Sequence, residues 1–131
     1  MINKNFLLVL LVLCLSFLST QCDDDNSSTQ EEERAELATL KSEIEALANT
    51  STCNESTECK SIAFGSKPCG GPWSYLIYST SIDTQKLEEM VNNYNQTEDK
   101  FNEKYGIASD CSLASPPTSI NCENNTCVAV Y

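Results

Sequence analysis

Six cysteines in one short segment constrain this fold more than any other feature of the sequence. The chain has 131 residues and eight cysteines, six of which follow residue 50. A segment of about 80 residues has too small a hydrophobic core to dispense with cross-links, and an even cysteine count predicts a disulfide framework. We therefore expect three disulfides and an oxidising compartment. The six are Cys53, Cys59, Cys69, Cys111, Cys122 and Cys127.

Metal and cofactor chemistry is not expected. The chain has no histidine and no Cys-x-x-Cys pair, which are the usual marks of a structural zinc site. Without histidine there is no His-based catalytic triad, and no phosphate loop or dinucleotide fingerprint is present. The sequence therefore predicts a protein that is not an enzyme and has no cofactor. An enzyme is the weakest of three hypotheses, behind a binding module and a protease inhibitor.

The N-terminal segment reads as a signal peptide over residues 1–21. Its apolar run, 6–18, covers about 20 Å as a helix, which is too short for a ~30 Å hydrocarbon core. The stretch from Leu18 to Cys22 resembles the lipobox of bacterial lipoproteins. This resemblance implies that Cys22 becomes the lipidated mature N-terminus and anchors the chain to a membrane; the alternative is an ordinary cleaved secretory signal.

An acidic tether is expected over residues 22–30, because its run of aspartates cannot bury itself. Acidic residues in this place resemble both a surface-export signal and an inner-membrane retention signal, so the membrane leaflet stays open. Thr29 and Glu32 have capping-box spacing and begin a predicted amphipathic helix over 31–50. The apolar stripe of this helix either docks on the domain or belongs to a free stalk. Its members are Leu37, Leu40, Ile44 and Leu47.

The remaining residues, 53–131, predict a disulfide-stapled α+β domain. Two strands within 59–79 flank a loop rich in Gly and Pro, and a long amphipathic helix from Asp83 or Thr84 to Tyr105 packs across this small antiparallel sheet. Residues 110–114 form a short strand candidate. Residues 119–131 predict a hairpin that turns on Asn124 and Asn125, which tolerate the positive φ of a type I′ turn.

The hairpin geometry also suggests a disulfide pairing. Cys122 lies opposite Cys127, where Cα atoms about 4.5 Å apart are within disulfide range. A Cys59–Cys111 bond is expected to close a longer loop, and Cys53–Cys69 then follows by elimination.

A wider pattern spans residues 53–127, and its specific core is the run from Cys69 to Pro72 followed by Tyr75-Leu76 and Tyr78-Ser79. This pattern resembles a group of uncharacterised bacterial secreted or lipid-anchored proteins. The resemblance implies a single fold and a cell-envelope location, with no activity attached. We therefore expect a lipid-anchored envelope binding module on the outer membrane or cell surface, or a secreted protein if Cys22 is not lipidated.

The contact surface for a protein partner is expected in the loop that joins the first two strands. The candidate residues are Lys67, Gly70, Gly71, Trp73 and Tyr75. Trp73 either anchors a partner or fills the core beneath the helix. A secreted protease inhibitor is the alternative function, with Lys67 as its specificity residue, although Pro68 would obstruct a substrate-like fit. The net charge of -11 excludes nucleic acid as a partner.

Overall fold

The computed structural model describes residues 28–131 and confirms the α+β class. Along the chain the elements are α2 (Gln30–Asn49), β1 (Cys59–Phe64), β2 (Ser74–Ser79), α3 (Thr84–Tyr105), β3 (Ser119–Glu123) and β4 (Thr126–Val130). The predicted signal segment and the lipidation candidate Cys22 lie outside the described residues.

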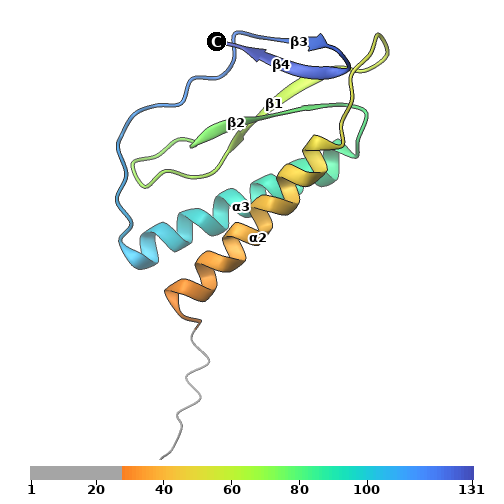
Figure 1. Ribbon diagram of the computed structural model, residues 1–131. Coiled ribbons are helices and arrows are strands. Elements are labelled where there is room, and N and C mark those ends of the chain that lie inside the picture. The colour runs from red at the N-terminus through yellow and green to blue at the C-terminus, as the bar shows by residue number, and fades with distance from the viewer. Residues whose placement is uncertain (1–27) are drawn as a thin grey trace, which may run out of the picture.

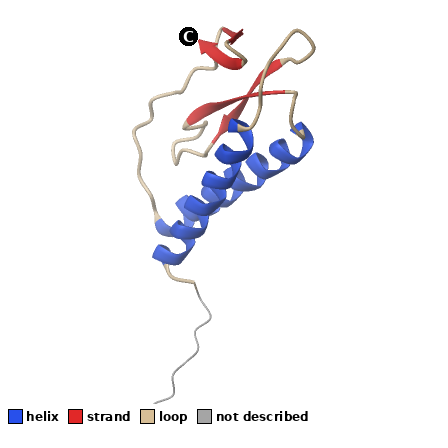
Figure 2. Cartoon of the chain, turned by 45° about the vertical axis from the view of Figure 1, so that its right-hand side comes forward, coloured by secondary structure: helices blue, strands red, loops and turns tan. Residues whose placement is uncertain are grey.

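The elements form three layers (Figure 1). Helices α2 and α3 lie side by side on one face of the β1–β2 hairpin, and the β3–β4 hairpin lies on its other face. Figure 2 shows the same separation of helices from strands after a 45° turn. The strands form two separate two-stranded antiparallel sheets, where the sequence suggested a single small one.

Helix α2 is docked on the domain, which decides between the two predicted roles of this helix. Its capping box is present: the Thr29 side chain accepts a hydrogen bond from the Glu32 amide, and the Glu32 carboxylate accepts one from the Thr29 amide. Leu37, Ile44 and Ala48 are buried in the same core as the strands. At the far end of the helix pair, the Lys104 ammonium lies 2.6 Å from the Glu33 carboxylate.

Helix α3 follows the predicted bounds. Asp83 caps its first turn by accepting a hydrogen bond from the Lys86 amide, and Gly106 ends it in the left-handed region at φ 59°. Leu87 and Val91 have no exposed surface, and burial of such side chains stabilises a fold by about 2 kcal/mol each. The core of the domain therefore lies between the two helices and the inner face of β1–β2. Its other members from this helix are Tyr94 and Phe101.

The β3–β4 hairpin turns as the sequence predicts. Asn124 and Asn125 have φ values of 49° and 64°, and Cys122 is the Cα partner of Cys127. The segment 110–114, however, is not a strand; it belongs to the extended connection from α3 to β3. Cys111 within this connection is held by a disulfide rather than by strand pairing.

The three disulfides exist, but all three predicted pairings are wrong. The bonds are Cys53–Cys122, Cys59–Cys127 and Cys69–Cys111. Directly opposed residues of a hairpin point to the same face, and that face of β3–β4 lies on the rest of the domain. Cys122 and Cys127 therefore each bond across the interface instead of to one another. The result is that β3–β4 is tied to the start of β1 and to the segment after α2.

Candidate functional site

The loop between β1 and β2, residues 65–73, is held rigidly by one face of α3. Asn95 accepts a hydrogen bond from the Gly65 amide at 2.7 Å and donates one to the Ala63 carbonyl at 3.0 Å. Glu98 accepts from the Ser66 amide at 2.6 Å, and Asn102 donates to the Ser66 carbonyl at 2.8 Å. The start of the loop is thus fixed by side chains of the helix rather than by strand pairing.

The rest of the loop closes on itself. The Lys67 amide donates to the Gly71 carbonyl, and the Gly70 amide donates to the Lys67 carbonyl, both at 2.8 Å. The Trp73 amide then donates a hydrogen bond to the Phe64 carbonyl at 3.1 Å, which brings the chain back into register for β2. The Cys69–Cys111 disulfide ties the tip to the connection that follows α3. As expected from the sequence, this loop is a compact cross-linked turn.

Lys67 does not offer its side chain to a partner, contrary to the expectation. The residue is 6% exposed, and its ammonium group donates to the Asp110 carboxylate at 3.0 Å and to the carbonyl and hydroxyl of Ser112 at 2.7 and 3.0 Å. All three ammonium protons are used. The same hydrogen bond and charge hold the pKa of Asp110 below its ordinary value. A protease inhibitor of this fold would lack the specificity residue that the sequence suggested.

Trp73 lies at the surface and does not fill the core beneath the helix. Its side chain is among the exposed large hydrophobic ones, at 43%, and the ammonium group of Lys67 lies 5.1 Å from the centre of its ring. Gly70 and Gly71 are exposed in the same loop, whereas Tyr75 is half-buried on β2. Of the candidate contact residues, Trp73 and the two glycines are therefore the accessible ones.

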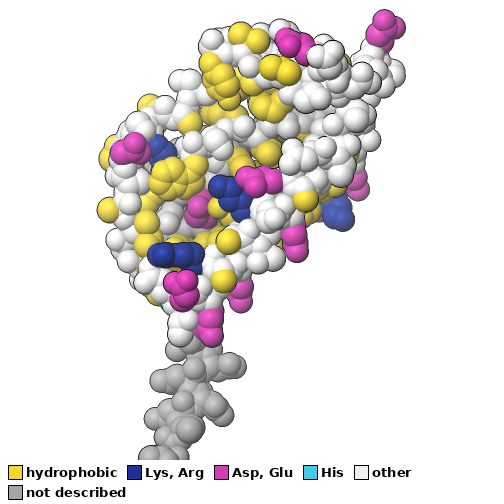
Figure 3. Space-filling view, viewed as in Figure 1, with side chains coloured by type: hydrophobic (Ala, Val, Ile, Leu, Met, Phe, Trp, Pro, Cys, Tyr) yellow, Lys and Arg dark blue, Asp and Glu magenta, His cyan; other side chains and the backbone are white. Residues whose placement is uncertain are grey.

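A groove of about 360 Å³ runs beside Trp73 between the two helices; we call it the Trp73 groove. Apolar surface is contributed by Leu37 of α2 and Phe101 of α3, and two basic side chains of α2 stand along one wall. These are Arg34, 6.0 Å above the Phe101 ring, and Lys41, 6.0 Å above the Phe64 ring. The space-filling view shows basic, acidic and hydrophobic side chains together on this face (Figure 3).

Sequence reasoning missed the residues that support this face. Asn95, Glu98 and Asn102 are spaced three and four apart, so they share one side of α3 next to the core stripe. That polar stripe was the available signal. Nor does Glu88 simply face solvent, because it accepts a hydrogen bond from the buried Tyr78 hydroxyl at 2.8 Å.

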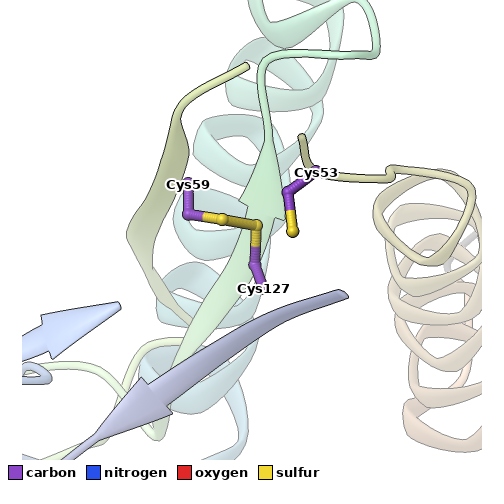
Figure 4. A group of neighbouring side chains, drawn as sticks. All are labelled: Cys53, Cys59 and Cys127. Carbon is purple, nitrogen blue, oxygen red and sulfur yellow. A yellow bond between two sulfur atoms is a disulfide. The ribbon is translucent and has the colours of Figure 1, made fainter. Parts of the chain in front are cut away.

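A second cluster of side chains joins the two hairpins. The Sγ atoms of Cys53, Cys59 and Cys127 lie within 4.8 Å of one another. Figure 4 shows the sulfur of Cys53 beside the Cys59–Cys127 bond. In this oxidised form the sulfurs are bonded in pairs and offer no thiolate to a metal.

Comparison of the chain with protein-family models, curated proteins and solved structures found no match. Among residues 28–131, neither helix is both long and apolar enough to cross a bilayer.

Proposed function

We propose that this protein is a lipid-anchored binding module of the cell envelope, with loop 65–73 and the Trp73 groove as its recognition face. The main support for the proposal is that an exposed tryptophan follows a loop whose backbone conformation is already restricted. Trp73 is 43% exposed, yet its own amide and the loop before it are fixed by hydrogen bonds and a disulfide.

Rigidity supports binding for a thermodynamic reason. A flexible loop loses conformational entropy when it docks, whereas a preorganised one has already lost it during folding. Tryptophan and arginine are the residues most enriched among side chains that dominate binding energy. Trp73 and Arg34 both line the same groove, so the face combines a fixed aromatic anchor with a cation.

The chemistry of the groove favours a partner segment that carries an apolar group beside an anionic one. Arg34 and Lys41 form no ion pair with any residue between 28 and 131. The carboxylate in the groove, Glu98, is already an acceptor for the Ser66 amide and the Tyr94 hydroxyl. Arg34 and Lys41 are therefore the charged side chains of the groove that can pair with an anionic group of a ligand. They provide a local positive site in a protein whose net charge is -11.

Two features of the chain support a location in the cell envelope. Three disulfides fit the extracellular space or the cell envelope, where thiols are oxidised. Lipid anchoring rests on the resemblance of the stretch before Cys22 to a lipobox. The acyl chains of a lipidated Cys22 would add ~0.8 kcal/mol of membrane affinity for each buried CH₂ group, which is enough for stable attachment when several chains are present.

Site-specific photo-cross-linking in the intact cell tests the binding face. A photoreactive amino acid in place of Trp73 should give a discrete cross-linked species, which mass spectrometry can identify. The matched control carries the same group in place of Tyr131, which is 73% exposed and directly follows β4. If both positions give the same products, or neither gives any, the loop is not the recognition face.

A separate labelling experiment tests the anchor. Wild-type cells fed a palmitate analogue should yield labelled protein in the membrane fraction, and the Cys22→Ser variant should be unlabelled. Wild-type protein that is unlabelled and freely soluble would make the anchor wrong without affecting the binding face.

A further inference from the structure

Two disulfides meet at one point beneath the β3–β4 hairpin. The Sγ atoms within 4.8 Å of one another belong to Cys53, Cys59 and Cys127. Cys53 is bonded to Cys122, whereas Cys59 is bonded to Cys127, so this group spans two different bonds. If the Cys53–Cys122 bond is broken, the Cys53 sulfur therefore already lies next to the Cys59–Cys127 bond. Figure 4 shows this approach directly.

The two ends of the Cys53–Cys122 bond differ in exposure. Cys53 is 1% exposed, whereas Cys122 lies on β3 as an exposed residue. Thiol–disulfide exchange occurs at the sulfur that the attacking thiolate can reach. An external thiolate therefore attacks Cys122, and Cys53 is the group that leaves into the protein interior.

Cys53 stays in place after its bond breaks, because its neighbours are held independently. The Thr52 amide donates to the Ser81 hydroxyl at 2.9 Å, and the Asn54 amide donates to the Thr57 hydroxyl at 2.8 Å. Neither hydrogen bond involves the hairpin that carries Cys122. The freed thiolate thus remains within reach of the Cys59–Cys127 bond.

We propose that these four cysteines form a thiol–disulfide exchange centre that a small external monothiol triggers. The external thiolate attacks Cys122 Sγ and displaces the Cys53 thiolate. That thiolate attacks Cys59 Sγ, which forms a Cys53–Cys59 bond and displaces the Cys127 thiolate. Cys127 then attacks Cys122 Sγ, which forms a Cys122–Cys127 bond and releases the external thiolate. Two disulfides are present before and after, so the protein is neither oxidised nor reduced and the thiol is regenerated.

The hairpin register makes the last step possible. Cys122 and Cys127 are direct Cα partners across β3 and β4, and opposed positions of an antiparallel pair lie about 4.5–5.5 Å apart, within disulfide range. After exchange, the hairpin has lost its covalent links to Cys53 and Cys59. Neither β3 nor β4 contains a buried residue, and the Cys53 amide still donates a hydrogen bond to the Asn125 carbonyl in the turn of this hairpin at 2.9 Å. After exchange the hairpin is therefore held by noncovalent contacts alone, and the centre acts as a thiol-triggered loosening of this layer.

Tryptic mapping without reduction tests the proposal on the wild-type protein. Cleavage at lysines places Cys53 and Cys59 together on peptide 42–60, and Cys111, Cys122 and Cys127 on peptide 105–131. Before treatment, peptide 42–60 should be linked to 105–131. After incubation with a substoichiometric amount of 2-mercaptoethanol, more of it should be free than the thiol added, and each copy should carry an internal disulfide.

The same digest contains its own control. Peptide 61–86 carries Cys69 and should stay linked to 105–131 through Cys111. Peptide 42–60 that stays linked, or that is freed only in reduced form by excess thiol, would overturn the proposal.

A pair of variants tests the order of events. In Cys122→Ser the Cys53 thiol is free from the start, so a Cys53–Cys59 bond should form with no added thiol. A doubled Cys69→Ser and Cys111→Ser variant keeps the centre intact, and its thiol-dependent release of peptide 42–60 should match the wild type. A Cys122→Ser protein that keeps its Cys59–Cys127 bond beside a free Cys53 would contradict the mechanism.

Discussion

The buried ammonium group of Lys67 lies 5.1 Å from the centre of the Trp73 ring, within the range of a cation–π interaction. A cation close to an aromatic ring is attracted to its π face. Lys67 is also hydrogen-bonded to Asp110 and Ser112 in the segment after α3. This one side chain therefore joins the recognition face to the connection that carries Cys111.

Replacing Lys67 should loosen the loop. Lys67→Met keeps most of the buried stem but removes charge-assisted hydrogen bonds, and we expect a loss of about 2 kcal/mol in the free energy of unfolding. Chemical denaturation measures this change. The control is Lys60→Met: Lys60 is about half exposed and lies 3.8 Å from an exposed Glu58, so its loss should have almost no effect. Equal effects of the two variants would mean that the Lys67 contacts are not stabilising.

Low pH should weaken the interaction between Lys67 and Asp110. The pKa of Asp110 lies below its ordinary value of 3.8 because of Lys67, so its contribution is present above pH 3.8 and is lost as the pH falls through the lowered pKa. The difference in unfolding free energy between the wild type and Asp110→Asn should therefore shrink toward zero as the pH falls below 3.8. A difference that is independent of pH would exclude the Asp110 charge as its source.

Gly65 should be intolerant of a side chain for a steric reason. It has φ +84°, and a Cβ atom there would lie 2.5 Å from Cδ1 of Trp73. Gly65→Ala is expected to displace Trp73 and cost more than the roughly 1 kcal/mol of backbone strain alone. Gly70→Ala is the matched control, because φ is +90° but nothing lies within 4 Å of the added Cβ. Thermal unfolding of both variants separates the clash from the strain.

Much of the fold could be predicted from local sequence signals. The capping box at Thr29, the Asp83 cap and the turn at Asn124 each depend on residues a few positions apart, and all three are present. The compact loop after β1 was likewise evident from its Gly and Pro content.

The disulfide pairing could not be predicted, because it depends on how layers far apart in sequence meet. Cys122 and Cys53 are separated by 69 residues, and nothing in either neighbourhood specifies the other. The burial of Lys67 escaped prediction for the same reason, since its partners lie 43 and 45 residues away. The exposed position of Trp73 depends on the helix pair, which fills the core without it.

The Tyr78 hydroxyl should lose its proton at a higher pH than that of an ordinary tyrosine. Burial, together with its hydrogen bond to Glu88, raises its pKa from 10.0 to about 12. The folded state therefore holds this proton more tightly than the unfolded state, and the resulting stability is present below pH 10 and is lost as the pH rises toward about 12. Tyrosinate absorbance of the wild type minus that of Tyr78→Phe isolates this group. The Glu88→Gln substitution should lower the pKa of Tyr78. An unchanged pKa would mean that the Glu88 carboxylate does not contribute to the raised value.

The fluorescence of Trp73, read with an aqueous quencher, tests the exposed recognition face most directly. The chain has one tryptophan, so the whole tryptophan signal reports this side chain. At 43% exposure, the emission of the folded protein should be readily quenched by acrylamide, and Trp73→Ala should cost only about 1 kcal/mol in stability, against ~3–5 kcal/mol for a core tryptophan. A blue-shifted emission that acrylamide does not reach, with unfolding of Trp73→Ala, would place the ring in the core and contradict the proposed binding face.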